Sequence, residues 1–388
     1  MSIFELDAAA RRARGAEWTA QEILQQPGLW REIATAHAAR SAALQAFLAP
    51  LLRLPGLRIV LTGAGTSSIV GEILRTPLAR RTGRRVEAIA TTDLVAAPLA
   101  CLEPETPTLL VSFARSGDSP ESVATFDLAT NHVRHCAQLV VTCNPDGALL
   151  ARARAHREAH AIVLPAAAND RGFAMTSSFT GMLLAAALAF DLLAPGEIEW
   201  AASLGVALPS IWLPRLESLV QSGFERAVFL GSGVLKALAF EAALKLLELT
   251  DGRVVALGES PLGFRHGPKT ILTDSTLVVV LLSNDPYTQR YDLDLLTELR
   301  REGVAGAVLS LAAQPVPTTA ADDIDLVVPV PAGLVPSDLA LCLPYAMFAQ
   351  SLALSRSLSL GLRPDRPHAA GTVNRVVQGV TIHPFEPR

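Results

Sequence analysis

The stretch RIVLTGAGTSSIVGEILRTPLAR, residues 58–80, decides the fold, because it predicts a buried strand, a glycine turn and a helix in direct succession. The same order returns in RAVFLGSGVLKALAFEAALKLLELT at 226–250. A second pair of segments, TLLVSFARSGDSPESVATFDLA (108–129) and TLVVVLLSNDPYTQRYDLDLLTEL (276–299), repeats it. Short β-branched strands alternating with helical patterns predict an α/β fold with parallel sheets.

The spacing of these segments indicates a duplication. Gly63 and Gly231 are 231 − 63 = 168 positions apart, and Ser112 and Ser283 are 283 − 112 = 171 positions apart. Two motif pairs at nearly one offset favour two tandem domains, each a parallel sheet flanked by helices in the flavodoxin-like manner.

The flanking segments complete a predicted domain plan. The N-terminal residues have apolar positions at helical spacing, with a break expected at Pro27-Gly28. A linker is expected near Pro195-Gly196, where a helix should end. The plan has an N-terminal helical segment at 1–50, a first domain at 51–200, a second domain at 215–362 and a C-terminal tail at 363–388.

Composition excludes several classes of protein. The chain has 388 residues, half of them apolar, and a net charge of −4, so no positive field favours nucleic acid or an acidic membrane. The apolar run GMLLAAALAF (181–190) is too short to span a bilayer, and the N-terminus carries acids instead of the apolar core of a secretory signal. The four cysteines show no C-x-x-C spacing, which indicates reduced core thiols in a cytoplasmic protein.

Two turns rich in hydroxyl groups predict an anion site. In GAGTSS, Ser67 and Ser68 follow two glycines at a helix start, although ordinary helix capping explains this turn about equally well. The turn lacks the third glycine of a dinucleotide motif. In RSGDSPES, Arg115, Ser116 and Ser119 gather around Gly117. Because both turns follow parallel strands, they should meet at one sheet edge, and a monophosphate is the expected occupant.

A charged stripe marks one helix of the second half. Glu241, Lys245 and Glu248 lie at i, i+4 and i+7 and therefore share one helix face. Such a pattern is usually a solvated ion pair, but leucines on most sides predict that this face lines a pocket or a subunit interface.

Histidines offer two further candidates. His266 lies in the Gly/Pro-rich loop GESPLGFRHGPKT, where a functional and a structural role are equally plausible. His156 and His160 have i, i+4 metal-ligand spacing on a predicted helix, but no third ligand accompanies them. The sequence therefore predicts no metal site.

These motifs resemble a known family. GAGTSS and SFARSGDSPES are similar to the phosphosugar-binding turns of the sugar isomerase (SIS) family, and ALKLLELTDG with GESPLGFRHGPKT is similar to the second SIS domain of glucosamine-6-phosphate synthase. DRGFAMTSS, GFRHGPK, PYTQRYDLDLL and GTVNRVVQGV resemble the group of galactosamine-6-phosphate deaminase/isomerases, also called tagatose-6-phosphate ketose/aldose isomerases. The resemblance covers about residues 50–388.

The resemblance implies that the domain at 51–200 binds the phosphosugar, that the domain at 215–362 carries the catalytic helix and the histidine loop, and that the tail at 363–388 closes the site. It implies that Ser67, Ser116 and Ser119 bind the phosphate with Arg115 beside them, that Glu248 moves a proton between C1 and C2, and that His266 assists ring opening, often in the site of a neighbouring subunit. Ala114 stands where the family often has serine. Gln378 stands where the synthase has its Schiff-base lysine, so acid–base enolisation is expected instead of a covalent imine.

The expected function is deamination of galactosamine 6-phosphate, or a similar hexosamine 6-phosphate, to ketose 6-phosphate and ammonia by a homo-oligomer. No cofactor is expected. Ser68 and Lys245 complete the expected substrate-binding set. The alternatives are plain aldose/ketose isomerisation and a non-catalytic sugar-phosphate sensor, although residues 1–50 lack the basic recognition helix of a regulator.

Overall fold

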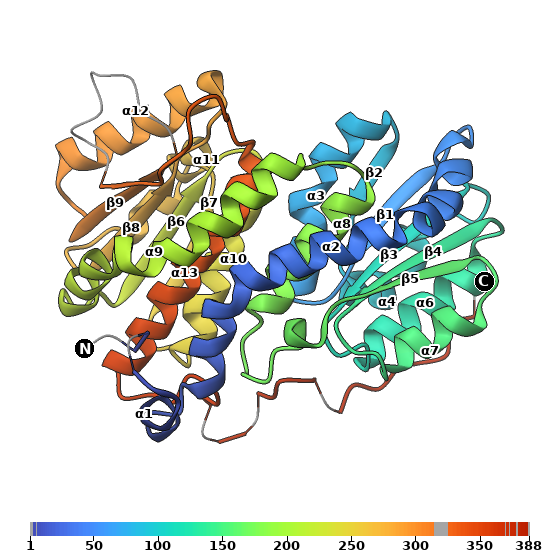
Figure 1. Cartoon of the computed structure of the whole chain (residues 1–388), viewed down its shortest axis with the longest axis horizontal. Coiled ribbons are helices and arrows are strands. Elements are labelled where there is room, and N and C mark those ends of the chain that lie inside the picture. The colour runs from blue at the N-terminus through green and yellow to red at the C-terminus, as the bar shows by residue number, and fades with distance from the viewer. Residues whose placement is uncertain are drawn as a thin grey trace. The chain divides into compact units, whose positions relative to one another are not determined.

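Two parallel five-stranded sheets form the framework of the chain (Figure 1). The computed structural model describes residues 3–4, 6–313, 325–368, 370–371, 373–377 and 379–386. The chain divides into two units, each built around one sheet. The first-sheet unit comprises Leu29–Asp170, Ser177–Leu192 and Ala370–Arg388, and the second-sheet unit comprises Met1–Gly28, Arg171–Thr176 and Leu193–Ala369.

The first sheet has the strand order β2-β1-β3-β4-β5 with every pair parallel. Its central strands are buried on both faces, which their continuous runs of Val, Leu and Ile allow. Helices α4, α6 and α7 gather on one side of this sheet in Figure 1, where Leu94, Ala129 and Leu149 pack on the strands. The strands are β1 (Arg58–Thr62), β2 (Arg85–Ala88), β3 (Thr108–Ala114), β4 (Cys136–Thr142) and β5 (Ala159–Val163).

The helices around the first sheet precede, connect and follow its strands in the chain. They are α2 (Glu17–Arg53, which begins in the second-sheet unit), α3 (Thr66–Thr82), α4 (Thr91–Ala96), α5 (Pro98–Cys101), α6 (Pro120–His132), α7 (Ala148–Ala155), η1 (Ala166–Ala168) and α8 (Ser177–Ala189).

The second sheet has the order β7-β6-β8-β9-β10, again parallel throughout. Phe264 of α11 and the leucines of α12 cover one of its faces. The strands are β6 (Arg226–Gly231), β7 (Val255–Glu259), β8 (Thr276–Leu281), β9 (Ala307–Ala312) and β10 (Leu326–Val327). The helices of this unit are α1 (Ala8–Ala13), α9 (Pro195–Gln221), α10 (Val234–Leu249), α11 (Pro261–Phe264), η2 (Pro268–Ile271), α12 (Pro286–Glu302) and α13 (Asp338–Ser359).

The two sheets share one strand order, so the predicted fold class is confirmed. Their registers correct one detail. Arg58 pairs with Thr108 in the first sheet and Arg226 pairs with Thr276 in the second, so both strand pairs are offset by 168 positions (226 − 58 and 276 − 108). Ser283 therefore corresponds to Arg115, and the expected match with Ser112 is wrong. The turn before α12 is two residues shorter than the turn before α6, because 286 − 120 is 166.

Two expected breaks in helices are wrong. Helix α2 continues through Pro27-Gly28, since Ile23 and Trp30 are fully buried on either side and this packing outweighs one lost backbone hydrogen bond. Pro195 starts a helix of 27 residues instead of ending one, a position that suits proline because the first-turn N–H groups need no helical acceptor.

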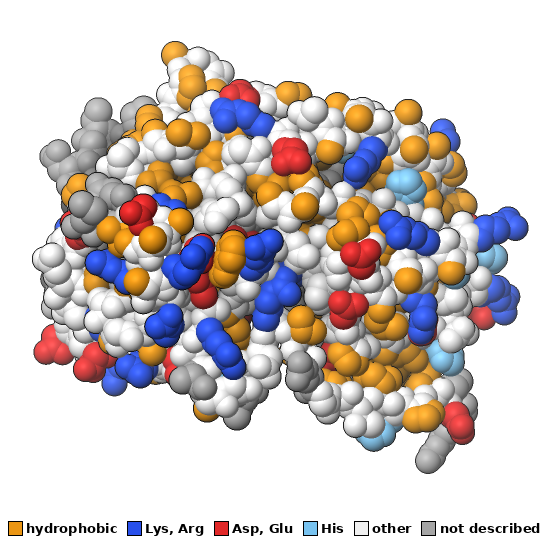
Figure 2. Space-filling view, turned by 60° about the horizontal axis from the view of Figure 1, so that its bottom comes forward, with side chains coloured by type: hydrophobic (Ala, Val, Ile, Leu, Met, Phe, Trp, Pro, Cys, Tyr) orange, Lys and Arg blue, Asp and Glu red, His pale blue; other side chains and the backbone are white. Residues whose placement is uncertain are grey.

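Within the described part of the chain, one helix, α13, is long and apolar enough to cross a membrane. In its most apolar window 89% of the residues are buried inside the protein, which is typical of a core helix. Basic, acidic and apolar side chains lie intermixed on the face drawn in Figure 2. The four cysteines are free thiols, three of them buried, as the sequence predicted.

Candidate active site

Two glycines shape the turn between β1 and α3. A β-carbon on Gly63 would lie 2.6 Å from the carbonyl carbon of Ser67, so only glycine allows this close approach. Gly65 is the N-cap of α3 and has φ +55°, in the left-handed region. Thr66 and Ser67 are buried directly behind it, at the helix N-terminus, where the helix dipole favours an anion.

The two serines of this turn have different uses. The Ser68 hydroxyl donates to the Gly65 carbonyl oxygen at 2.7 Å, so it is committed to its own helical turn. Ser67 is buried at 5% exposure in the predicted phosphate turn. Since the N-cap is Gly65, the capping alternative does not describe either serine.

The turn between β3 and α6 holds the other predicted phosphate ligands. Arg115 is 7% exposed, and Gly117 adopts φ +68°, a left-handed conformation that suits glycine. Ser119 is the N-cap of α6, and its hydroxyl lies 2.6 Å from that of Ser122. The Ser116 hydroxyl accepts from the backbone N–H of Asp118 at 3.3 Å.

Neighbouring groups brace this second turn. The Asp118 carboxylate accepts from the backbone N–H of Ala148 at 2.9 Å, at the start of α7. The Asn144 amide donates to the Ser116 carbonyl oxygen at 2.7 Å. Because β1 and β3 are neighbours with Thr62 paired to Ser112, both predicted phosphate turns lie at the same sheet edge.

In the second-sheet unit, the corresponding turns donate hydrogen bonds to carboxylates of helices α12 and α13. Asp292, which is fully buried, accepts from the Ser232 hydroxyl at 2.5 Å and from the Ser283 N–H at 3.0 Å. Asp338 accepts from the Ser283 hydroxyl at 2.5 Å and from the Asn284 N–H at 2.7 Å. Burial, and then the charge of Asp338, raise the pKa of Asp292 to about 6.

The charged stripe on α10 is not a solvated surface. Lys245 is 1% exposed and forms ion pairs with Glu248 and, at 3.5 Å, with Glu241. The side chain of Glu241 is 2% exposed, whereas that of Glu248 is 26% exposed. Glu248 is therefore the carboxylate of this cluster that a substrate can reach.

The His266 loop presents an exposed imidazole on an anchored backbone. Its flanking residue Arg265 pairs with Glu298 of α12 at 2.8 Å. Lys269 pairs with the same carboxylate and with Glu302 at 2.7 Å. These ion pairs hold the loop against α12 on both sides of the histidine.

Comparison with known proteins identifies the relatives. Residues 52–192 match the SIS domain. The "D-galactosamine-6-phosphate deaminase AgaS" of Escherichia coli is 46% identical over 375 residues, covering 95% of this chain and 96% of that one. The chain belongs to the AgaS family of SIS-domain proteins. The equivalent protein from Shewanella sp. (strain ANA-3) is 43% identical over 380 residues, covering 96% and 93%.

A solved structure at a similar sequence identity supports the AgaS-family fold along the whole chain. The tagatose-6-phosphate ketose/aldose isomerase from Escherichia coli superimposes with a TM-score of 0.87 at 41% identity, covering 98% of this chain and 99% of that one. The predicted resemblance to this group is thus confirmed.

Other predicted features of this AgaS-family chain have mixed outcomes. Gln378 lies outside the described residues. The prediction that one helix carries His156 and His160 is wrong, because α7 ends at Ala155. His160 lies in β5 and stacks on the ring of Phe47. The described part of the chain contains no cluster of three or more His, Cys, Asp or Glu residues suited to a metal.

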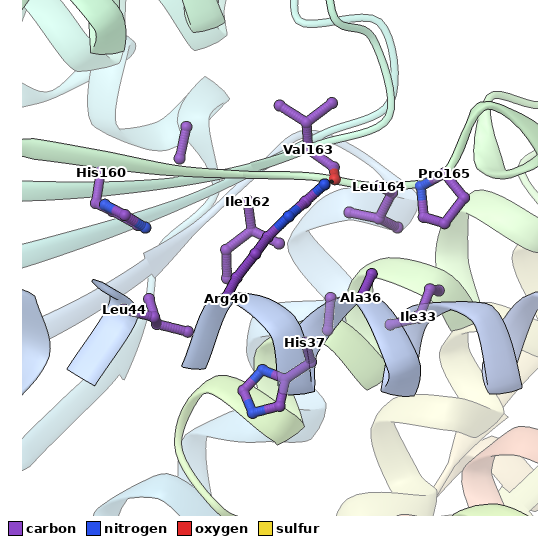
Figure 3. Close-up of a pocket in the computed structure, with 12 residues that line it drawn as sticks. Ile33, Ala36, His37, Arg40, Leu44, His160, Ile162, Val163, Leu164 and Pro165 are labelled. Carbon is purple, nitrogen blue, oxygen red and sulfur yellow. Dashed lines mark hydrogen bonds between the residues drawn. The ribbon is translucent and has the colours of Figure 1, made fainter. Parts of the chain in front are cut away.

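A pocket between α2 and β5 is separate from the predicted site residues (Figure 3). Mainly apolar side chains line it, together with His37 and His160. The Arg40 side chain crosses from α2 to donate to the Val163 carbonyl oxygen at 2.8 Å, which ties the helix to the edge strand.

Sequence reasoning assigned no role to Arg375, which contacts the second predicted phosphate turn. Arg115 donates to the carbonyl oxygen of Arg375 in the C-terminal tail at 2.5 Å. The motifs DRGFAMTSS and GTVNRVVQGV, which contribute Asp170 and Arg375, stood out in the sequence without an assigned role.

Proposed function

We propose that this chain is a hexosamine-6-phosphate deaminase that converts galactosamine 6-phosphate and water to a ketose 6-phosphate and ammonia. The observation that carries the proposal is the buried Lys245 paired with the accessible carboxylate of Glu248 on α10. A carboxylate held at a fixed place by a buried cation suits proton transfer at a sugar carbon.

We assign phosphate binding to Ser67, Arg115, Ser116 and Ser119. Two hydroxyl-rich turns at one sheet edge, a buried arginine and two helix N-termini support this assignment. Ser68 is the weakest member of the predicted set, because its hydroxyl already serves its own helical turn.

In the proposed reaction, His266, or a water that it positions, opens the sugar ring. Glu248 then removes the C2 proton of the open-chain aldehyde, which gives an enolamine, and the proton is returned at C1. The resulting C2 imine reacts with water, so that the C–N bond breaks and ammonia leaves. Lys245 forms an ion pair with Glu248 and thereby orients it.

The names of the relatives support the galacto configuration. Loss of nitrogen from C2 of galactosamine 6-phosphate gives tagatose 6-phosphate, the sugar in the name of the similar isomerase structure. Plain aldose/ketose isomerisation is the second candidate, because it uses the same proton transfer without loss of nitrogen. We further propose that the enzyme acts in the cytoplasm as a homo-oligomer.

Ammonia release tests this function. Purified protein should be incubated with galactosamine, glucosamine and N-acetylgalactosamine 6-phosphates, and separately with tagatose 6-phosphate. We expect ammonia to appear fastest with galactosamine 6-phosphate. Interconversion of tagatose 6-phosphate with its aldose, and no ammonia from any amino sugar, would favour the isomerase. A sugar-phosphate sensor would bind these compounds and turn over none of them.

A further inference from the structure

Among the described residues of the C-terminal tail, Arg375 and Phe385 contact other parts of the first-sheet unit. Its described residues lie outside helices and strands, and Val373 and Val377 are each 54% exposed. Arg375, between them, is half-buried. Further along, Phe385 contacts the ring of His132 at 5.0 Å between centroids. Such contacts keep an extended segment in place.

The Arg375 side chain binds the segment before α8, at Asn169 and Asp170. Its Nε donates to the Asp170 carbonyl oxygen at 2.8 Å, and its Nη2 donates to Asn169 Oδ1 at 2.8 Å. Asp170 is itself fixed, because its fully buried carboxylate accepts from the Ser178 N–H at 2.8 Å and from the Ser177 N–H at 3.1 Å. The guanidinium therefore holds the tail to the start of α8.

The backbone of the same residue reaches the predicted phosphate turn. The Arg375 carbonyl oxygen accepts from Arg115 Nη2 at 2.5 Å. A guanidinium is planar with its donors in a rigid fork, so the bond from Nη2 restricts the directions in which the remaining donors of Arg115 can point. Arg115, Arg375 and Asp170 lie close together around the buried thiol of Cys143. Burial, and then Asp170, raise the pKa of this thiol, and the two arginines offset part of the rise.

We infer that Arg375 is a positioning residue of the phosphate site, whose side chain locks the tail to Asn169 and Asp170 so that its carbonyl oxygen orients Arg115. The inference rests on the proposed phosphate-binding role of Arg115. On this inference, the tail motif and the segment before α8 act together to orient Arg115. The tail and the phosphate turn are thereby coupled, and the Arg375 side chain acts through Arg115.

Direct binding of inorganic phosphate and of galactosamine 6-phosphate to the full chain tests this inference. The variants are Arg375→Ala, Arg375→Lys, Arg115→Ala and the double alanine variant. Asn374→Ala is the matched control, because the Asn374 amide contacts the tail carbonyl of Gly371 and not the phosphate turn. Thermal unfolding of each variant shows whether it is folded.

We expect Arg375→Ala to weaken phosphate binding about tenfold or more, the usual size of a lost charge-assisted contact. Lysine should restore only part of the affinity, because it cannot make both bonds. The double variant should bind no more weakly than Arg115→Ala, since the two residues act through one contact. In turnover assays KM should rise while kcat changes little.

Wild-type phosphate affinity in folded Arg375→Ala would overturn the inference. Losses that multiply in the double variant would also overturn it, because they would show independent roles. Absence of ammonia release by the wild type, with phosphate binding intact, would instead count against the proposed function and leave the Arg375 comparison valid.

Discussion

At the residue scale, a buried lysine controls the geometry of the α10 cluster. An ammonium group with 1% exposure is tolerated only beside carboxylates, and Lys245 has Glu241 and Glu248 within ion-pair distance. The differing exposure of the two acids separates their roles. Glu241 pairs with the ammonium group inside the protein, and Glu248 is the accessible acid to which we assign the proton transfer.

Ser116 should act in binding and not in turnover. Replacing Ser116 with alanine removes a hydrogen bond to phosphate worth about 1.5–3 kcal/mol, so KM should rise roughly tenfold to a hundredfold while kcat changes less. Ser68→Ala is the matched control, because that hydroxyl donates within its own turn. Steady-state kinetics with added inorganic phosphate would measure both, and an unchanged KM in Ser116→Ala would speak against the phosphate site.

Asp292 should make stability depend on pH. Its pKa of about 6 in the folded protein exceeds the ordinary 3.8. The contribution of Asp292 to the free energy of unfolding is therefore fully present below about pH 3.8 and is lost as pH rises through about 6. As pH rises from 4 to 7, the free energy of unfolding of Asp292→Asn should therefore increase relative to that of the wild type by about 3 kcal/mol. Urea unfolding across that range would measure the gain, and a constant difference between the two proteins would contradict it.

At the scale of elements, the His266 loop shows how a short irregular segment is held in place. Two cations on either side of the histidine converge on Glu298 of α12. The sequence predicted a loop with one candidate histidine. It could not predict the anchor, because Glu298 lies about thirty positions away, and only the packing of α12 brings it near.

Removing that anchor should disturb catalysis more than folding. Partly exposed ion pairs contribute about 0–1 kcal/mol each, so Glu298→Gln should leave the melting temperature nearly unchanged. Turnover should fall toward the level of His266→Ala, because the imidazole loses its fixed position. Glu302→Gln, which removes only a contact to Lys269, is the control. Full activity of Glu298→Gln would show that the loop needs no such anchor.

The same scale shows where the sequence was sufficient and where it was not. Buried β-branched runs and glycine turns predicted both sheets and the positions of the two hydroxyl-rich turns, because those signals are local. The continuity of α2 through Pro27-Gly28 depends on tertiary packing, which overrides the local signal. The role of Arg375 depends on a contact across 260 positions and has no local signature.

At the scale of the whole molecule, the two copies of one fold have diverged. In the first-sheet unit the turns after β1 and β3 hold serines and an arginine, and in the second-sheet unit the matching turns donate to Asp292 and Asp338. Internal carboxylates thus take the place that an anion would need. We therefore expect one sugar phosphate to bind per chain.

Exposure of His266 agrees with a site shared between subunits, which complementation can test. Inactive Glu248→Gln and His266→Ala proteins, mixed under conditions of subunit exchange, should recover about a quarter of wild-type activity in a dimer with shared sites, because one site in four is then intact. No recovery after verified exchange would show that each chain supplies both residues to its own site.

The most direct test of the account follows the C2 proton and the nitrogen together. Wild-type protein should release ammonia from C2-deuterated galactosamine 6-phosphate and transfer the label to C1 or to solvent. Glu248→Gln keeps the shape of the side chain but cannot accept the proton, so both signals should fall together by about 10²–10⁴-fold with substrate affinity retained. A folded Glu248→Gln protein that still released ammonia and label near the wild-type rate would contradict the proposed mechanism.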